Sequence, residues 1–98
     1  MPKYILSTEA QNSLKGIQKF SKENFGKNRT KLYLEELRKQ LKALAENPSL
    51  GVVREDLKVG FYSHFTGSHT IYYRIPPEYI DIIDVLHQSM DPSRHISN

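Results

Sequence analysis

The chain has 98 residues, a length typical of one folded domain, and it contains no cysteine, which excludes a disulfide framework and a thiolate metal site. The 14 basic and 11 acidic residues give a net charge of +3, a surplus that suits an acidic protein partner as well as nucleic acid. No run of about 18 apolar residues and no signal-peptide pattern occurs. We therefore expect a single domain over residues 1–98 that is soluble and cytoplasmic and does not enter a membrane.

The N-terminal quarter of the chain predicts a short strand that leads into a long helix. Residues Tyr4–Ser7 favour the strand, and Thr8 with Gln11 fits a capping box in which Thr8 is the N-cap. The helix should end at Gly26, since glycine tolerates a left-handed backbone. Its apolar positions recur at helical spacing, at Ala10, Leu14, Ile17, Phe20 and Phe25.

A second helix follows after a very short link. Asn28 is its predicted N-cap, and Asn47 with Pro48 should end it, because the residue before a proline avoids the helical region. The short link predicts an antiparallel helical hairpin. The second helix carries an apolar stripe made of Tyr33, Leu34, Leu37, Leu41, Leu44 and Ala45.

Three runs in the second half of the chain are rich in β-branched and aromatic residues: 57–65, 69–75 and 79–87. Turn signals at Thr66–Ser68 and Pro76–Glu78 separate them. The order β-α-α-β-β-β predicts an α+β fold, in which the hairpin packs on one face of a small, mostly antiparallel sheet and the other face is solvated.

Several motifs resemble the ParE branch of the ParE/RelE toxins of toxin–antitoxin systems. The chain opens with Y-x-L-S and A-x-x-x-L-x-x-I, and its second helix has Y-L-x-x-L followed by L-x-x-L-A-x-N-P. G-S-H-x-I-Y-Y-R at Gly67–Arg74 is similar to the family's central strand, and L-H-Q-x-M-D-P-x-R-H at Leu86–His95 to its C-terminal motif. Together these motifs cover nearly the whole chain in the family's order.

The resemblance implies a toxin that inhibits DNA gyrase by protein–protein contact. It also implies a hetero-oligomer with a small acidic antitoxin of the ParD type, through which the toxin would meet DNA only indirectly. The related RelE branch cleaves mRNA on the ribosome, so an endoribonuclease is the alternative function. We expect no cofactor for either activity.

An endoribonuclease would need a base, an acid and cations converging on one face. The strands offer candidates for these roles: His64, His69, His87, Arg54, Lys58, Arg74, Tyr62, Tyr72 and Tyr73. However, tyrosine is an ordinary strand residue, and the chain lacks the terminal tyrosine of many RelE-type toxins. We therefore expect a non-enzymatic toxin without catalytic residues.

The expected contacts are with two proteins. The candidates for target binding are Tyr62, His69, Arg74, His87, Arg94 and His95. The last two should lie in an exposed tail that leaves the sheet at Asp91 and Pro92. The candidates for antitoxin binding are Tyr33, Leu34, Leu37 and Leu41. The four histidines have no helical i,i+3 or i,i+4 spacing, so we expect no metal site.

One position departs from the family pattern. Many ParE-like chains carry an arginine two residues after the glycine that corresponds to Gly60, whereas this chain has Tyr62. The departure leaves a third alternative, an inactive member that acts only as a co-repressor bound to its antitoxin.

Overall fold

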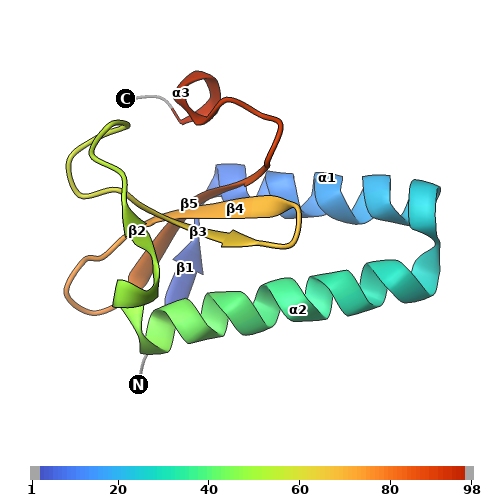
Figure 1. The fold of residues 1–98 in the computed structure, drawn as a ribbon. Helices are drawn as coiled ribbons and strands as arrows, with labels where there is room; N and C mark the ends of the chain where they lie inside the picture. The colour runs from blue at the N-terminus through green and yellow to red at the C-terminus, as the bar shows by residue number, and fades with distance from the viewer. Residues whose placement is uncertain (1–2, 97–98) are drawn as a thin grey trace.

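The computed structural model describes residues 3–96, which form a helical hairpin packed against a five-stranded sheet (Figure 1). The elements in chain order are β1 (Tyr4–Leu6), α1 (Thr8–Phe25), α2 (Lys27–Glu46), the 3₁₀ turn η1 (Pro48–Leu50), β2 (Val52–Val53), β3 (Tyr62–Thr66), β4 (His69–Arg74), β5 (Ile80–His87) and α3 (Pro92–His95). The predicted α+β fold is confirmed. None of the helices in this described part is long and apolar enough to cross a lipid bilayer.

The strands lie in the order β1-β5-β4-β3-β2, with β1 parallel to β5 and every other pair antiparallel. The predicted run 57–65 is wrong at its start, because β3 begins only at Tyr62. Before it, the Phe61 amide turns back to donate to the Lys58 carbonyl, and Gly60 has a φ of +86°. This turn breaks the strand, and the separate edge strand β2 was not predicted.

Ser7 joins β1 to α1 and is the N-cap of α1, so the predicted cap at Thr8 is wrong by one residue. The Ser7 hydroxyl accepts from the Ala10 amide at 3.0 Å and donates to the Ile83 carbonyl at 2.6 Å. Ile83 is free to accept because it lies at a β-bulge, where Tyr72 pairs with Asp84 and Tyr73 with Ile82. One hydroxyl thus caps the helix and fixes it to the sheet.

The link between the two helices is a single glycine. Gly26 has a φ of +86° and a ψ of 173°, so its backbone is extended with positive φ rather than left-handed helical. Asn28 is not the N-cap predicted for α2, because the helix already begins at Lys27, and the Thr30 hydroxyl bonds to the Gly26 carbonyl at 2.8 Å. The Thr30 hydroxyl also lies 3.0 Å from that of Ser21, which ties the two helices together.

The core lies between the hairpin and one face of the sheet. Leu37, Leu41 and Leu44 of α2 are buried, as the apolar stripe predicted. They share the interior with sheet residues that include Ile71, Tyr73, Ile80, Ile82 and Val85. Leu14 and Ile17 of α1 are only half-buried at the margin of this core.

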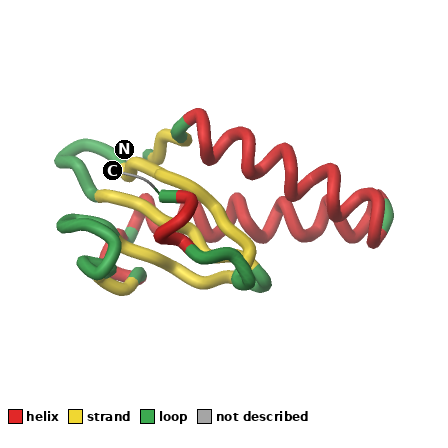
Figure 2. Tube along the Cα trace, turned by 90° about the horizontal axis from the view of Figure 1, so that it is seen from above, coloured by secondary structure: helices red, strands yellow, loops and turns green. Residues whose placement is uncertain are grey.

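The second face of the sheet is also covered, contrary to the solvated face predicted. The short helix α3 lies on the side of the sheet opposite α2 in Figure 1, and it crosses the strands when seen from above in Figure 2. Tyr72 and Ser63 are paired residues on this face, and both are buried. The loop after β2 adds further cover, since the guanidinium of Arg54 lies 5.8 Å from the Tyr72 ring centre.

Candidate functional site

The hairpin extends beyond the end of the sheet (Figure 1). An apolar groove of about 870 Å³ opens between its helices and the adjoining ends of β4 and β5. Its apolar walls come from α1, the end of β5 and the segment that follows β5. They are Ile17, Phe20, Phe25, Val85, Leu86 and Met90. Phe20 is 62% exposed and Phe25 is 55% exposed. Large aromatic side chains exposed together in a concave surface are typical of a binding site for a protein partner.

Sequence periodicity did not find this groove, because it placed Phe20 and Phe25 among the core positions of the first helix. The feature of the sequence that could have indicated the groove is the pair of small polar residues Ser21 and Thr30, which are both buried. Their hydroxyls hold the two helices against each other beyond the sheet. The neighbouring phenylalanines therefore have no strand to cover them.

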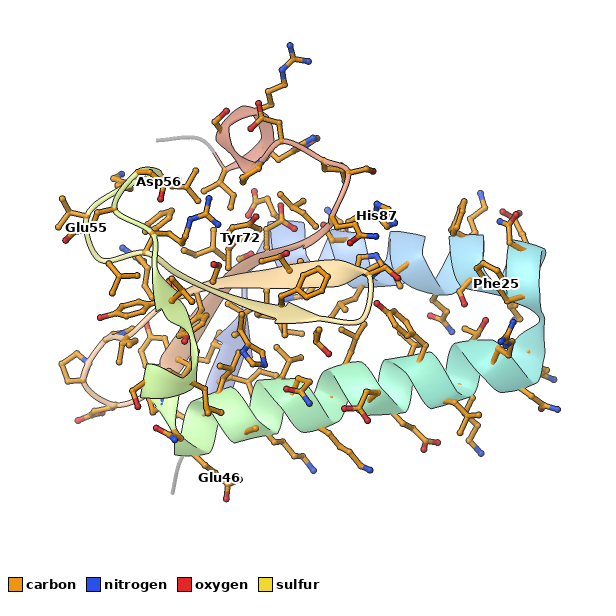
Figure 3. All side chains as sticks on the ribbon, in the orientation of Figure 1. Phe25, Glu46, Glu55, Asp56, Tyr72 and His87 are labelled. Carbon is orange, nitrogen blue, oxygen red and sulfur yellow. The ribbon has the colours of Figure 1, made fainter. Side chains whose placement is uncertain are left out.

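Two of the predicted target-binding residues, His69 and His87, form one wall of the groove. They are directly paired across β4 and β5, and their rings meet edge to face with centroids 5.3 Å apart. Figure 3 shows His87 at the end of β5, near α1. Tyr33 of α2 reaches the same place, with its hydroxyl 2.5 Å from His69 Nδ1.

Tyr33 holds the ring of His69 in place. The Tyr33 hydroxyl accepts from the Ser68 amide at 3.3 Å and forms a second hydrogen bond with His69 Nδ1. Burial, and secondly the nearby His87, lower the pKa of His69 to about 4. His69 is therefore neutral at pH 7. The tight turn before it needs Gly67, whose φ is +61° and where a Cβ would lie 2.9 Å from the Tyr33 ring.

The remaining target-binding candidates lie apart from this pair. Tyr62 stacks on Tyr73 with ring centroids 5.5 Å apart. Arg74 is exposed at the other end of β4 and forms an ion pair with Asp81 at 2.8 Å. The six predicted residues therefore do not form one site.

The other two, Arg94 and His95, are exposed on α3, as predicted, but the segment is a short helix rather than a tail that leaves the sheet. Asp91 caps this helix by accepting from the Ser93 hydroxyl and amide, and these bonds lower the pKa of Asp91.

Two of the four candidates for antitoxin binding are buried in the core of the chain. Leu37 and Leu41 are each 2% exposed, so the interior of the chain already uses their surface. Tyr33 and Leu34 are half-exposed. Of these two, Tyr33 lines the groove, whereas Leu34 lies in a shallow seam between α1 and α2.

The acid and base candidates for a nuclease do not converge on one point. His64 is held by Gln40 of α2 at 2.8 Å. The Tyr73 hydroxyl donates to the Pro48 carbonyl at 2.7 Å, and burial raises the pKa of this fully buried tyrosine. His69 is paired with Tyr33 at the groove. Each of these three groups forms a hydrogen bond within the fold, and the three lie at different places on the side of the sheet that the hairpin covers.

The cationic candidate Arg54 lies on the opposite face of the sheet. Its guanidinium donates twice to Asp56, at 3.0 Å for each bond, and to Ser63 at 3.3 Å. The hydrogen bond with Arg54 lowers the pKa of Asp56, which therefore stays ionised and neutralises the cation. Among residues 3–96, no three histidine or acidic side chains gather in a metal-binding arrangement.

Two solved structures have the same fold. The chromosomal ParDE toxin–antitoxin system of Pseudomonas aeruginosa superposes with a TM-score of 0.75 at 16% identity, covering 89% of this chain and 96% of that chain. The toxin–antitoxin complex RelBE2 of Mycobacterium tuberculosis superposes with a TM-score of 0.65 at 20% identity, covering 89% and 99%. The chain therefore has the fold of a chain in each of these two toxin–antitoxin structures.

Sequence comparison identifies the family within this class. The model of the ParE toxins of the type II toxin–antitoxin system parDE matches residues 4–92. Toxin ParE1 of Mycobacterium tuberculosis is 35% identical over 95 residues, covering 96% of this chain and 97% of the relative. Toxin ParE1 of Caulobacter vibrioides is 34% identical over 96 residues, covering 98% and 99%. The chain belongs to the ParE toxin family, which confirms the resemblance found in the sequence.

Proposed function

We propose that this toxin inhibits DNA gyrase by protein–protein contact in the cytoplasm and is neutralised by a ParD-like antitoxin. The observation that carries the proposal is the match to the ParE family over residues 4–92. The ParE resemblance implies gyrase poisoning, whereas mRNA cleavage is implied only for the RelE branch.

The side-chain geometry supports a toxin that acts by contact rather than by catalysis. His69 is neutral and paired with Tyr33, and Arg54 is neutralised by Asp56 on the opposite face. A phosphoryl-transfer site needs its acid, base and cations within hydrogen-bond reach of one reacting phosphate. These groups lack that arrangement.

We assign the groove to the antitoxin. Phe20 and Phe25 are exposed apolar anchors, and the guanidinium of Arg29 lies 5.9 Å from the Phe25 ring centre at the groove margin. This combination fits an apolar helix or extended segment that carries an acidic residue facing Arg29. Tyr33, the candidate that lines the groove, contacts the same segment.

Two assays with purified components test the target. The toxin is added to DNA gyrase during supercoiling of relaxed plasmid, and in parallel to ribosomes translating a defined mRNA. We expect loss of supercoiling and an intact mRNA. Cleaved mRNA with unimpaired supercoiling would contradict the proposal and establish the endoribonuclease alternative.

A further inference from the structure

Positive charge is concentrated in the distal half of the hairpin. Residues 15–31 contain six basic residues and one acidic residue, Glu23. In contrast, residues 47–98 contain four basic and six acidic residues. The net charge of the whole chain therefore understates the charge of this one region.

Most of these cations lie on the side of the hairpin that faces away from the sheet. On α1, Lys15, Lys19 and Lys22 follow i,i+4,i+7 spacing and form one strip. The positions that pack inward, Ala10 and Ser21, lie on the other side of the same helix. All three lysines are exposed.

A second strip runs along α2. Lys27, Lys31 and Arg38 are spaced by four and seven residues, so they share a side of this helix, and all three are exposed. Lys15 and Arg38 both border the shallow seam where α1 meets α2. The two strips therefore flank this seam. Together the six residues form what we term the outer basic face.

None of the six cations of the outer basic face takes part in an ion pair within residues 3–96. The two ion pairs among the residues that the structure describes are Arg54–Asp56 and Arg74–Asp81, and neither involves the hairpin. Such a concentration of unpaired positive charge on rigid helices attracts a polyanion.

We propose that the outer basic face binds the phosphate backbone of duplex DNA. Two cationic strips on helices packed about 8–10 Å apart match two rows of phosphates flanking a groove about 12 Å wide. Single-stranded nucleic acid would call for aromatic stacking platforms. The exposed aromatics of the hairpin, Phe20 and Phe25, instead line the groove.

Two surfaces of the hairpin differ in their chemistry. The groove is mostly apolar and fits a protein segment, whereas the outer basic face is built of lysine and arginine and fits phosphates. DNA binding by this face departs from the sequence-based expectation that the toxin meets DNA only through its antitoxin. It does not depend on gyrase being the target, because the binding is measured without gyrase.

The test is fluorescence anisotropy of a labelled random-sequence duplex of about 30 base pairs, titrated with the full-length toxin at several salt concentrations. The variant Lys19→Gln/Lys22→Gln removes two charges from the outer basic face. The control Lys3→Gln/Lys58→Gln removes two exposed charges elsewhere, so both variants have the same net charge. Circular dichroism checks that each variant keeps its helices.

We expect the wild-type affinity to fall with salt at a log–log slope of about −3 or steeper. The hairpin variant should bind about tenfold more weakly with a slope flatter by about 2, since two phosphate contacts are lost. The control should bind within about twofold of wild type. Absence of binding at low salt, or equal losses in both variants, would overturn the proposal. So would a poly-glutamate peptide that binds this face more tightly than the duplex, because the face would then fit an acidic protein.

Discussion

The Ser7 hydroxyl caps α1 and also bonds to the sheet. The sequence alone does not show that one residue makes both hydrogen bonds. A hydroxyl at Thr8 would also cap a helix, and the S-T pair leaves the choice between them open. The choice depends on the β-bulge at Ile83, whose carbonyl accepts from Ser7. Sequence patterns reveal a cap motif, but they do not reveal a bulge 76 residues away.

Replacement of Ser7 by alanine should therefore destabilise the fold. It removes the N-cap bond to Ala10 and leaves the Ile83 carbonyl without its side-chain donor, and we expect a loss of about 1–3 kcal/mol. Thr8→Ala is the matched control and should cost less than about 0.5 kcal/mol. Urea unfolding monitored by circular dichroism measures both. A larger loss for Thr8→Ala would restore the cap predicted from the sequence.

His69 should make stability depend on pH. Its pKa is about 4 in the folded chain and 6.5 without the fold. Between these pH values the unfolded chain binds a proton that the folded chain excludes, so stability falls as the pH is lowered through this range. We expect wild type to lose more unfolding free energy between pH 7.5 and pH 5 than His69→Gln does. The control His95→Gln, at an exposed position, should follow wild type. Parallel profiles for wild type and His69→Gln would contradict this.

At the scale of elements, the second helix was predicted most completely. Its stripe places Leu37, Leu41 and Leu44 in the core, and Asn47 ends it. Periodicity predicts such a helix because its apolar face is continuous and meets the sheet along the buried part. The distal part of the first helix was misjudged because periodicity does not indicate how far the sheet extends beneath a helix.

The core assignment predicts a clear difference between two leucines of α2. Leu41 is 2% exposed and Leu32 is 66% exposed. Leu41→Ala should cost about 2–5 kcal/mol, because it leaves a cavity under the hairpin. Leu32→Ala should change the unfolding free energy by less than about 0.5 kcal/mol. Similar values for the two variants in thermal or urea unfolding would show that the hairpin does not pack on the sheet as described.

The C-terminal element α3 shows where turn signals mislead. Asp91 with Pro92 reads in the sequence as a turn that carries a tail away, whereas in the fold the same residues start a helix that lies over the sheet (Figure 2). Deletion of Met90–Asn98 should therefore uncover the face that holds Tyr72 and lower the melting temperature, whereas removal of an exposed tail that leaves the sheet would not.

Side-chain replacement separates the structural role of α3 from a role in toxicity. Arg94 and His95 are exposed, so Arg94→Ala/His95→Ala should leave the melting temperature within a few degrees of wild type. If these residues contact the target, the double variant should lose growth inhibition while it still binds the antitoxin. A variant that remains fully toxic would remove α3 from the target contact and direct attention to His87.

For the whole molecule, the sequence predicted the fold and the family better than the site. Motifs spread from Tyr4 to His95 are fixed by packing and turns, so they identify the architecture. Binding surfaces depend on what the fold leaves uncovered, as with Phe20, and on which residues the core uses, as with Leu37. No local sequence pattern shows which side chains the fold leaves uncovered and which it buries.

We propose a toxin that blocks gyrase and is neutralised through its groove. The most direct measurement is gyrase supercoiling titrated with toxin and then with antitoxin, for wild type, Phe20→Glu and the control Leu32→Glu. Phe20 and Leu32 are similarly exposed, but only Phe20 lines the groove. We expect all three to inhibit supercoiling, and the antitoxin to restore it for wild type and Leu32→Glu but not for Phe20→Glu. Unimpaired supercoiling with wild-type toxin, or equal rescue of all three proteins, would contradict the account.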